Sequence, residues 1–209
     1  DSSTSRGLGD VYKRQTGVML NGNDARQLGL LDALLGDNDY QQLMQALVNL
    51  PAQSQSDTLS KAQSLIQGME SKAASEVQTS DLDSHRHYII EALQQPDLAS
   101  IVASLGLLKG RGKWLDKAIR TMEHGSPTSL HLIYRAFNMN FTTVDDALLQ
   151  EYVLAVNATR LGEFKEGVRA LLIDKDRTPN WRYTSVETAP KAWIDQFFST
   201  DDMVPAQFL

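Results

Sequence analysis

Apolar residues recur at helical spacing along most of this chain, and that pattern limits the fold more than any other feature. Residues at i, i+3, i+4 and i+7 lie on one face of an α-helix, which can then be buried. The pattern occurs in Leu43–Leu50, Ala62–Met69, Leu115–Met122, Leu130–Phe137, Phe164–Leu172 and, as a general amphipathic stretch, Ala189–Phe198. The alternating pattern of a strand is nearly absent, and only the apolar run Leu30–Leu35 predicts one. We therefore expect a mainly α fold with at most one short strand.

Local signals indicate where several of these helices begin and end. Ser126 followed by Pro127 is typical of a helix N-terminus, because serine caps the free N–H groups and proline fits the first turn. A nucleophilic role for Ser126 beside His124 is the alternative, but capping already accounts for the serine. Pro51 ends the helix before it. We expect loops at residues 50–57, 110–112 and 176–183.

Composition excludes several classes of function. The 209 residues carry a net charge of −6, the opposite sign to a typical nucleic-acid-binding domain, so no nucleic-acid partner is expected. There is no cysteine, which excludes disulfides and thiolate metal sites. No apolar run reaches a length of about 18 residues, and the N-terminus lacks the apolar segment of a signal peptide. We expect a cytoplasmic protein that has no membrane partner.

The first fifteen residues, DSSTSRGLGDVYKRQ, follow neither a helical nor a strand period, which predicts a disordered tail. The stretch from Asp10 to Gln15 also resembles a translated transposase mosaic end, a sequence introduced when DNA libraries are prepared. We therefore interpret residues 1–15 as a non-native or disordered leader and expect the native chain to begin near Thr16. A native flexible leader is the alternative.

Ionisable residues form no complete active site by their spacing alone. His85 and His87 are two apart, which on a helix turns them about 200° from each other, so they cannot share a metal ion. Glu163 and Glu166 are three apart and could face one way as a general acid–base pair. The alternative is that they stabilise the first turn of a helix. We expect no metal site.

One patch is distinctly basic in an otherwise acidic chain. It sets five cations against the single acid Asp116: Lys109, Arg111, Lys113, Lys117 and Arg120. Such a patch can bind a phosphate group or an acidic partner, and the alternative is a solvated helix face. A second cationic group is interleaved with Asp174 and Asp176, so its net charge is small. It contains Arg169, Lys175, Arg177 and Arg182.

Three stretches together resemble the crotonase (enoyl-CoA hydratase/isomerase) superfamily. Gly162–Trp181, GEFKEGVRALLIDKDRTPNW, is similar to the C-terminal signature of its 3-hydroxyisobutyryl-CoA hydrolases. Gly125–Leu130, GSPTSL, resembles the helix start upstream of that signature. Thr16–Leu34, TGVMLNGNDARQLGLLDAL, resembles the crotonase segment in which a small helix precedes a short strand. The order and rough spacing of all three agree with the family.

The resemblance implies a fold, an activity and an incomplete site. It identifies residues 16–36 as the end of the crotonase core and residues 37–209 as a C-terminal helical region. The implied parent enzyme hydrolyses an acyl-CoA thioester in valine breakdown, with backbone N–H groups holding the carbonyl oxygen and acidic side chains moving protons. These groups belong to a ββα core expected upstream of Thr16. We therefore expect no catalytic residue in this chain and no hydrolysis by the chain alone.

The resemblance also suggests how the helical region contacts coenzyme A, which is part of the substrate, so no separate cofactor is expected. In hydratases the segment matching Gly162–Trp181 touches the adenosine and phosphates of CoA. Leu171 here matches an aromatic residue and Asp174 matches a lysine, so the charge is reversed. Lys175 and Arg177 are the candidate substrate-binding residues near the phosphates. The alternative is that Arg169 to Arg177 form a helix end with surface ion pairs.

Two other functions stay open at this point. The chain could belong to a hydratase or isomerase that shares the same helical region, because the core would distinguish these enzymes. It could instead be a helical interaction domain unrelated to enzymes, although Gly167 inside a helix and the ending DKDRTPNW argue against an ordinary bundle. We also expect exposed apolar surface around Ile133/Phe137 and Val168/Leu172, a tendency to associate, and a homo-oligomer as one outcome.

Overall fold

The computed structural model describes residues 17–18, 20–36, 39–51, 54–73 and 80–200, so the predicted leader over residues 1–15 lies outside the described residues. The described residues form ten α-helices and one π-helical turn, with no strand among them. The mainly α fold predicted from the sequence is confirmed. The described chain divides into two compact units, one of residues 20–87 and one of residues 17–18 and 88–200.

The first unit contains α2 (Gly22–Gln27), α3 (Asp39–Val48), α4 (Gln55–Ala73) and the first half of α5 (Asp81–Leu93), with α3 packed against α4. The short strand predicted over Leu30–Leu35 does not form, and these residues are irregular. The backbone N–H of Leu34 donates instead to the Glu70 carboxylate at 3.0 Å. The described residues of this unit contain no other strand with which Leu30–Leu35 could form backbone hydrogen bonds. An apolar run alone is therefore not enough to predict a strand.

A buried carboxylate joins α2 to the start of α5 in the first unit. Asp24 is 1% exposed, and its Oδ1 accepts from the Ser80 hydroxyl at 2.5 Å and from the Leu82 N–H at 3.2 Å. Its Oδ2 accepts from the Asn21 N–H at 3.0 Å, which completes a capping box on α2. One side chain therefore caps two helix N-termini that are far apart in the sequence.

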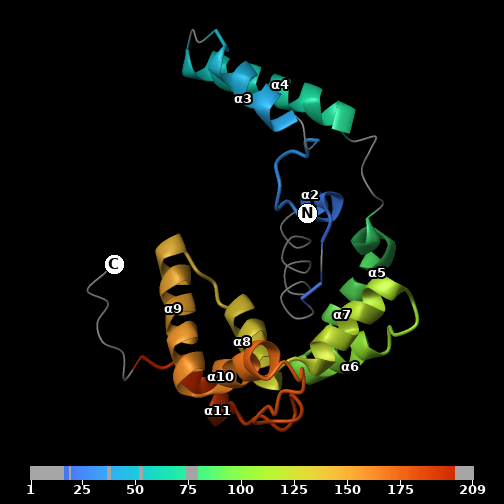
Figure 1. Cartoon of the computed structure of the whole chain (residues 1–209), viewed down its shortest axis with the longest axis vertical. Coiled ribbons are helices and arrows are strands. Elements are labelled where there is room, and N and C mark those ends of the chain that lie inside the picture. Colours follow the sequence, from blue (N-terminus) through green and yellow to red (C-terminus); the bar gives the residue numbers. More distant parts are fainter. Residues whose placement is uncertain (1–16, 19, 37–38, 52–53, 74–79, 201–209) are drawn as a thin grey trace. The chain divides into compact units, whose positions relative to one another are not determined.

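The second unit holds the remaining helices, and Figure 1 shows α10 and α11 near one end of α9, with α11 packed against both α8 and α9. Their bounds are α6 (Leu98–Gly106), α7 (Lys113–His124), α8 (Pro127–Phe137), α9 (Val144–Arg160), α10 (Glu163–Val168), the π-helical turn η1 (Arg169–Ile173) and α11 (Lys191–Phe197). One buried cluster consists of Ala189, Trp193, Ile194 and Phe197. Asn157 on α9 fixes the end of α11 by donating to the carbonyls of Phe197 and Ser199.

The predicted helix start at Ser126–Pro127 is confirmed. The Ser126 hydroxyl accepts from the Ser129 N–H at 3.2 Å, and Pro127 occupies the first turn of α8. The apolar face of α7 is also buried as its spacing predicts, with Leu115 and Ile119 both 0% exposed. None of the described helices is long and apolar enough to cross a lipid bilayer.

Two other helical faces of the second unit are apolar and exposed. One lies on α9 and contains Val144, Leu148, Leu149 and Tyr152. The other lies on α10 and η1 and contains Phe164, Leu171, Leu172 and Ile173, each at least 60% exposed. The expected exposed apolar surface is therefore present around Leu172, whereas Ile133, Phe137 and Val168 are half-buried.

Candidate functional site

An open pocket of about 660 Å³ lies in the second unit, between α7 and the segment that runs from α10 through η1 to Trp181. Its size falls within the range of small-molecule sites, about 300–1,000 Å³. Its walls combine apolar and cationic groups. They are formed by Lys117, Arg120, Thr121, His124, Gly125, Gly167, Ala170, Leu171, Arg177, Pro179 and Trp181.

The aromatic wall of the pocket depends on Gly167. A Cβ atom at this position would lie 3.3 Å from Cη2 of Trp181, closer than an ordinary contact, so the indole packs directly on the helix backbone. The Trp181 Nε1–H donates to the carbonyl oxygen of His124 at 3.0 Å, which ties the loop to the end of α7. The close contact with Trp181 therefore explains why a glycine lies inside this helix.

The cationic wall comes from both basic groups of the sequence. Lys117 and Arg120 extend from α7 and Arg177 from the loop after η1, and no carboxylate of the described residues lies within ion-pair distance of these three groups. An anion in the pocket would thus face positive charge that the described part of the chain does not already neutralise.

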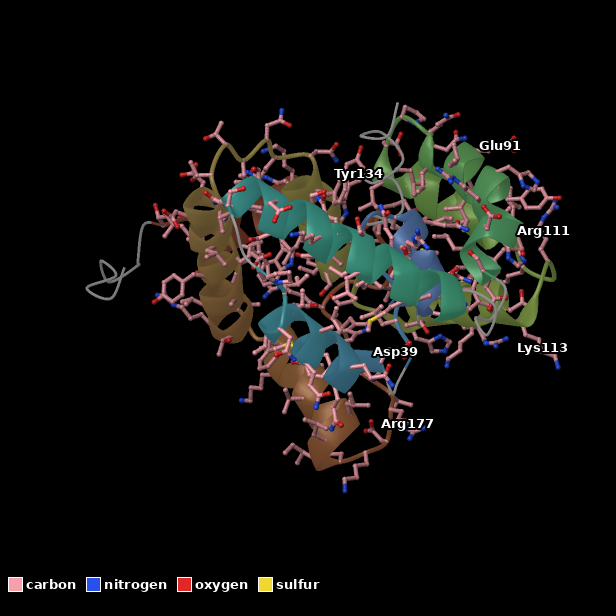
Figure 2. All side chains as sticks on the ribbon, turned by 90° about the horizontal axis from the view of Figure 1, so that it is seen from above. Asp39, Glu91, Arg111, Lys113, Tyr134 and Arg177 are labelled. Carbon is pink, nitrogen blue, oxygen red and sulfur yellow. The ribbon has the colours of Figure 1, made fainter. Side chains whose placement is uncertain are left out.

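The rest of the α7 basic patch does not line the pocket. Lys109 pairs with Glu123 at 2.7 Å, and the Arg111 guanidinium lies 4.1 Å from the centre of the Tyr88 ring. Figure 2 shows Arg111 and Lys113 at one edge of the unit, away from Arg177. The patch predicted from the sequence therefore separates: Lys109 is paired, Arg111 is stacked, and Lys117 and Arg120 line the pocket, whereas Lys113 does not.

The structure places the two candidate substrate-binding residues differently. Arg177 lines the pocket, whereas Lys175 is exposed and does not. Both adopt left-handed backbone conformations, with φ of 57° for Lys175 and 55° for Arg177, a region that non-glycine residues rarely occupy. Two such residues within three positions indicate a loop that its surroundings hold in place.

Arg169 at the start of η1 holds this loop together. Its guanidinium donates to both Glu166 oxygens at 2.7 and 2.9 Å, and to Asp174 and Asp176 at 2.7 Å each. It also donates to the Thr178 carbonyl at 3.2 Å. The ion pairs that the sequence suggested as the alternative for Arg169–Arg177 are therefore present around Arg169.

Two of the carboxylates that Arg169 binds, those of Glu166 and Asp176, have lowered pKa values. Hydrogen bonds from Arg169 and from the Asn180 N–H lower the pKa of Glu166 to about 2. A hydrogen bond from Arg169, followed by one from the Thr178 N–H, lowers the pKa of Asp176. These same bonds raise the pKa of Arg169. The loop is thus closed by charges that persist well into the acid range.

The other pairs considered from the sequence have structural partners. Buried Glu163 accepts from the Ser126 hydroxyl and from the Arg182 N–H, and Glu166 binds Arg169, so the two glutamates do not form an acid–base pair. The His124 ring bonds the Arg120 carbonyl rather than Ser126. Within the described residues there is no group of three or more His, Asp or Glu side chains suited to a metal ion.

Residues 5–198 match the protein family described as enoyl-CoA hydratase/isomerase. A mitochondrial 3-hydroxyisobutyryl-CoA hydrolase from Danio rerio is 28% identical over 199 residues, which cover 92% of this chain and 49% of that protein. The chain spans about half the length of such relatives.

Two solved structures share the fold. A carnitinyl-CoA dehydratase from Mycobacterium thermoresistibile has a TM-score of 0.70 at 20% identity, over 95% of this chain and 55% of that one. An enoyl-CoA hydratase from Rhodobacter sphaeroides has a TM-score of 0.69 at 21% identity, over 93% and 54% respectively. The likeness to crotonase-fold enzymes predicted from the sequence is confirmed. Because the family match extends over nearly the whole chain, this chain belongs to the enoyl-CoA hydratase/isomerase family.

Proposed function

We propose that this chain is the helical C-terminal portion of an acyl-CoA thioester hydrolase whose substrate is 3-hydroxyisobutyryl-CoA, an intermediate of valine breakdown. The observation that carries the proposal is the relationship to the Danio rerio hydrolase over 92% of this chain. The amino-acid sequence of Gly162–Trp181 resembles that of the hydrolases more than that of the hydratases, which supports the same assignment.

A hydratase or isomerase is the second candidate, because the two similar solved structures are named as a dehydratase and a hydratase rather than as hydrolases. The two candidates differ in product. The full-length parent protein should release free thiol from 3-hydroxyisobutyryl-CoA and should not hydrate crotonyl-CoA. Hydration of crotonyl-CoA without thiol release would overturn the hydrolase assignment.

In this proposal the pocket binds the phosphorylated adenosine end of coenzyme A. A purine ring suits the apolar wall at Leu171 and Trp181, and phosphate groups suit Lys117, Arg120 and Arg177. Lys175, exposed on the same loop, would lie near the outer phosphates. Arg177→Ala in the parent protein should raise KM several-fold and leave kcat nearly unchanged, because the phosphates lie far from the reacting carbonyl.

A matched control for that experiment is Arg135→Ala, which removes an arginine of similar exposure from a different cavity. Its KM should equal that of the unchanged parent. Equal KM values for Arg177→Ala and the unchanged parent would remove Arg177 from the substrate site.

The chain alone should not hydrolyse acyl-CoA substrates. Glu163 and Glu166, two carboxylates of the pocket segment, are engaged by Ser126 and Arg169 and are not placed to activate water. Release of thiol from 3-hydroxyisobutyryl-CoA by the purified 209-residue chain would contradict this part of the proposal.

The compartment and the assembly state complete the proposal. We expect the parent in the cytoplasm, although the Danio rerio relative is named as mitochondrial, and imaging of a fluorescent fusion in cells would decide between the two compartments.

The exposed apolar faces on α9 and on α10–η1 favour association of the isolated chain. Sedimentation that shows only a monomer at high concentration would contradict a homo-oligomer.

A further inference from the structure

The loop that carries Arg177 has a conformation that needs external support. Lys175 and Arg177 both lie in the left-handed region, where the Cβ atom crowds the backbone. Lys117, Arg120 and Arg177 line the same pocket, and like charges that share a pocket repel one another. Both effects oppose the position that Arg177 occupies.

The support comes from Arg169, which does not line the pocket. Its planar guanidinium binds Glu166 at the last turn of α10 and Asp174, Asp176 and the Thr178 carbonyl within the loop. It therefore connects the residues before, between and after the two left-handed positions. A lysine could not replace it, because a single ammonium group cannot bridge three carboxylates in this fork geometry.

Backbone hydrogen bonds repeat the same connection. The Arg177 N–H donates to the Ala170 carbonyl at 3.0 Å, the Thr178 N–H to Asp176 at 2.9 Å and the Asn180 N–H to Glu166 at 2.6 Å. Two of these three acceptors are carboxylates that Arg169 holds. Loss of Arg169 would therefore release the acceptors together with the loop.

We propose that Arg169 is a positioning residue, which places Arg177 in the pocket and so sets the affinity for a phosphorylated ligand without touching it. This inference rests on the proposed function for the identity of the bound group. The role of Arg169 in the conformation of the loop does not depend on the proposed function. The loop conformation and the binding of the ligand are therefore tested separately.

The first test measures binding of adenosine 3′,5′-bisphosphate to the chain by calorimetry. Arg169→Ala should weaken binding about tenfold, as much as Arg177→Ala, and Arg169→Lys should not restore it. Arg135→Ala, the control, should bind as the unchanged chain does.

The second test needs no ligand. Amide hydrogen exchange at Arg177, Thr178 and Asn180 should speed up at least about tenfold in Arg169→Ala, while exchange in α7 stays unchanged. Asp176→Asn, which keeps the side-chain shape, should give a smaller increase. Unchanged loop exchange in Arg169→Ala, or unchanged affinity of that variant, would each overturn the positioning role.

The two tests separate the possible failures. If the unchanged chain does not bind adenosine 3′,5′-bisphosphate, the nucleotide site in the proposed function is wrong, and the exchange data alone decide the role of Arg169. If adenosine 3′,5′-bisphosphate binds but Arg169→Ala binds it equally well, the site stands and the positioning role is wrong.

Discussion

The helix α7 and the segment α10–η1 have similar apolar spacing in the sequence but are held in different ways. On α7 the apolar residues are buried, and Leu115, Ala118, Ile119 and Met122 are at most 2% exposed. On α10–η1 the apolar residues Phe164, Leu171 and Leu172 are at least 60% exposed. Helical periodicity thus identifies an apolar face but does not say whether the described chain covers it.

Polar anchors replace apolar burial on α10–η1. Glu163 at its start binds Ser126, Gly167 in its middle receives Trp181, and Arg169 near its end binds three carboxylates. Apart from buried Ala170 and half-buried Val168, the segment is therefore held by hydrogen bonds and one close ring contact. Four measurements test this difference between the apolar burial of α7 and the polar anchoring of α10–η1.

Truncation of one residue on each face gives the largest contrast. Ile119→Ala removes a fully buried side chain and should lower the free energy of unfolding by about 3 kcal/mol, since core truncations cost about 2–5 kcal/mol. Leu172→Ala, at an exposed position, should change it by less than about 0.5 kcal/mol. Urea unfolding followed by circular dichroism measures both. Equal losses would mean that the two faces are covered alike.

Removal of the hydroxyl at position 126 tests the first anchor. Ser126→Ala loses the cap of α8 and leaves buried Glu163 without one donor, so the expected loss of unfolding free energy is about 2 kcal/mol. Thr143→Ala loses the cap of α9 and a hydrogen bond to the exposed Asp146 carboxylate, and it should cost about 1 kcal/mol. The same urea titration compares them, and a smaller loss for Ser126→Ala would show that Glu163 does not depend on it.

A methyl group at two glycines tests the ring contact. Gly167→Ala gains helix propensity but presses on Trp181, and overpacking of about 1–3 kcal/mol should leave a net destabilisation of about 1 kcal/mol. Gly106→Ala at the end of α6 meets nothing within 4 Å and should stabilise the chain by about 0.5 kcal/mol. Thermal unfolding gives the sign of each change, and stabilisation by Gly167→Ala would mean that Trp181 can move aside.

Acidification gives the smallest and most local effect. The pKa of Glu166 is lowered from 4.5 to about 2, so the stability contributed by its ionised form is full above pH 4.5 and is lost as the pH falls through about 2. The Asn180 amide signal in NMR spectra should therefore stay unchanged at pH 4 and shift only near pH 2. A transition near pH 4.5 would show that Arg169 does not hold Glu166.

Local signals in the sequence predicted the local structure well. The Ser126–Pro127 start, the buried face of α7 and the exposed apolar surface near Leu172 are all found in the structure. The strand over Leu30–Leu35 was wrong, because an apolar run becomes a strand only when another strand accepts its hydrogen bonds.

Long-range contacts could not be read from spacing. Nothing near Asp24 in the sequence indicates that it caps α5, whose first N–H groups lie more than fifty residues away. The pocket joins Lys117 and Arg120 to Arg177, and only the folded chain places these two basic groups together. Arg169 lies in a stretch of alternating positive and negative charges, and the sequence did not show which carboxylates it binds. Gly167 was a further local signal of the site, since glycine within a helix indicates a close approach.

The π-helical turn at Arg169–Ile173 has a consequence for how this region could have evolved. Its closing bond runs from the Asp174 N–H to the Arg169 carbonyl at 2.8 Å, five residues back, so the turn contains one residue more than an α-helix would. Deleting a single residue there would restore ordinary winding and rotate every later side chain by about 100°. A one-residue insertion into a regular helix would change the direction of Asp174 relative to Arg169 in this way, whereas Asp176 takes its position from the loop that follows.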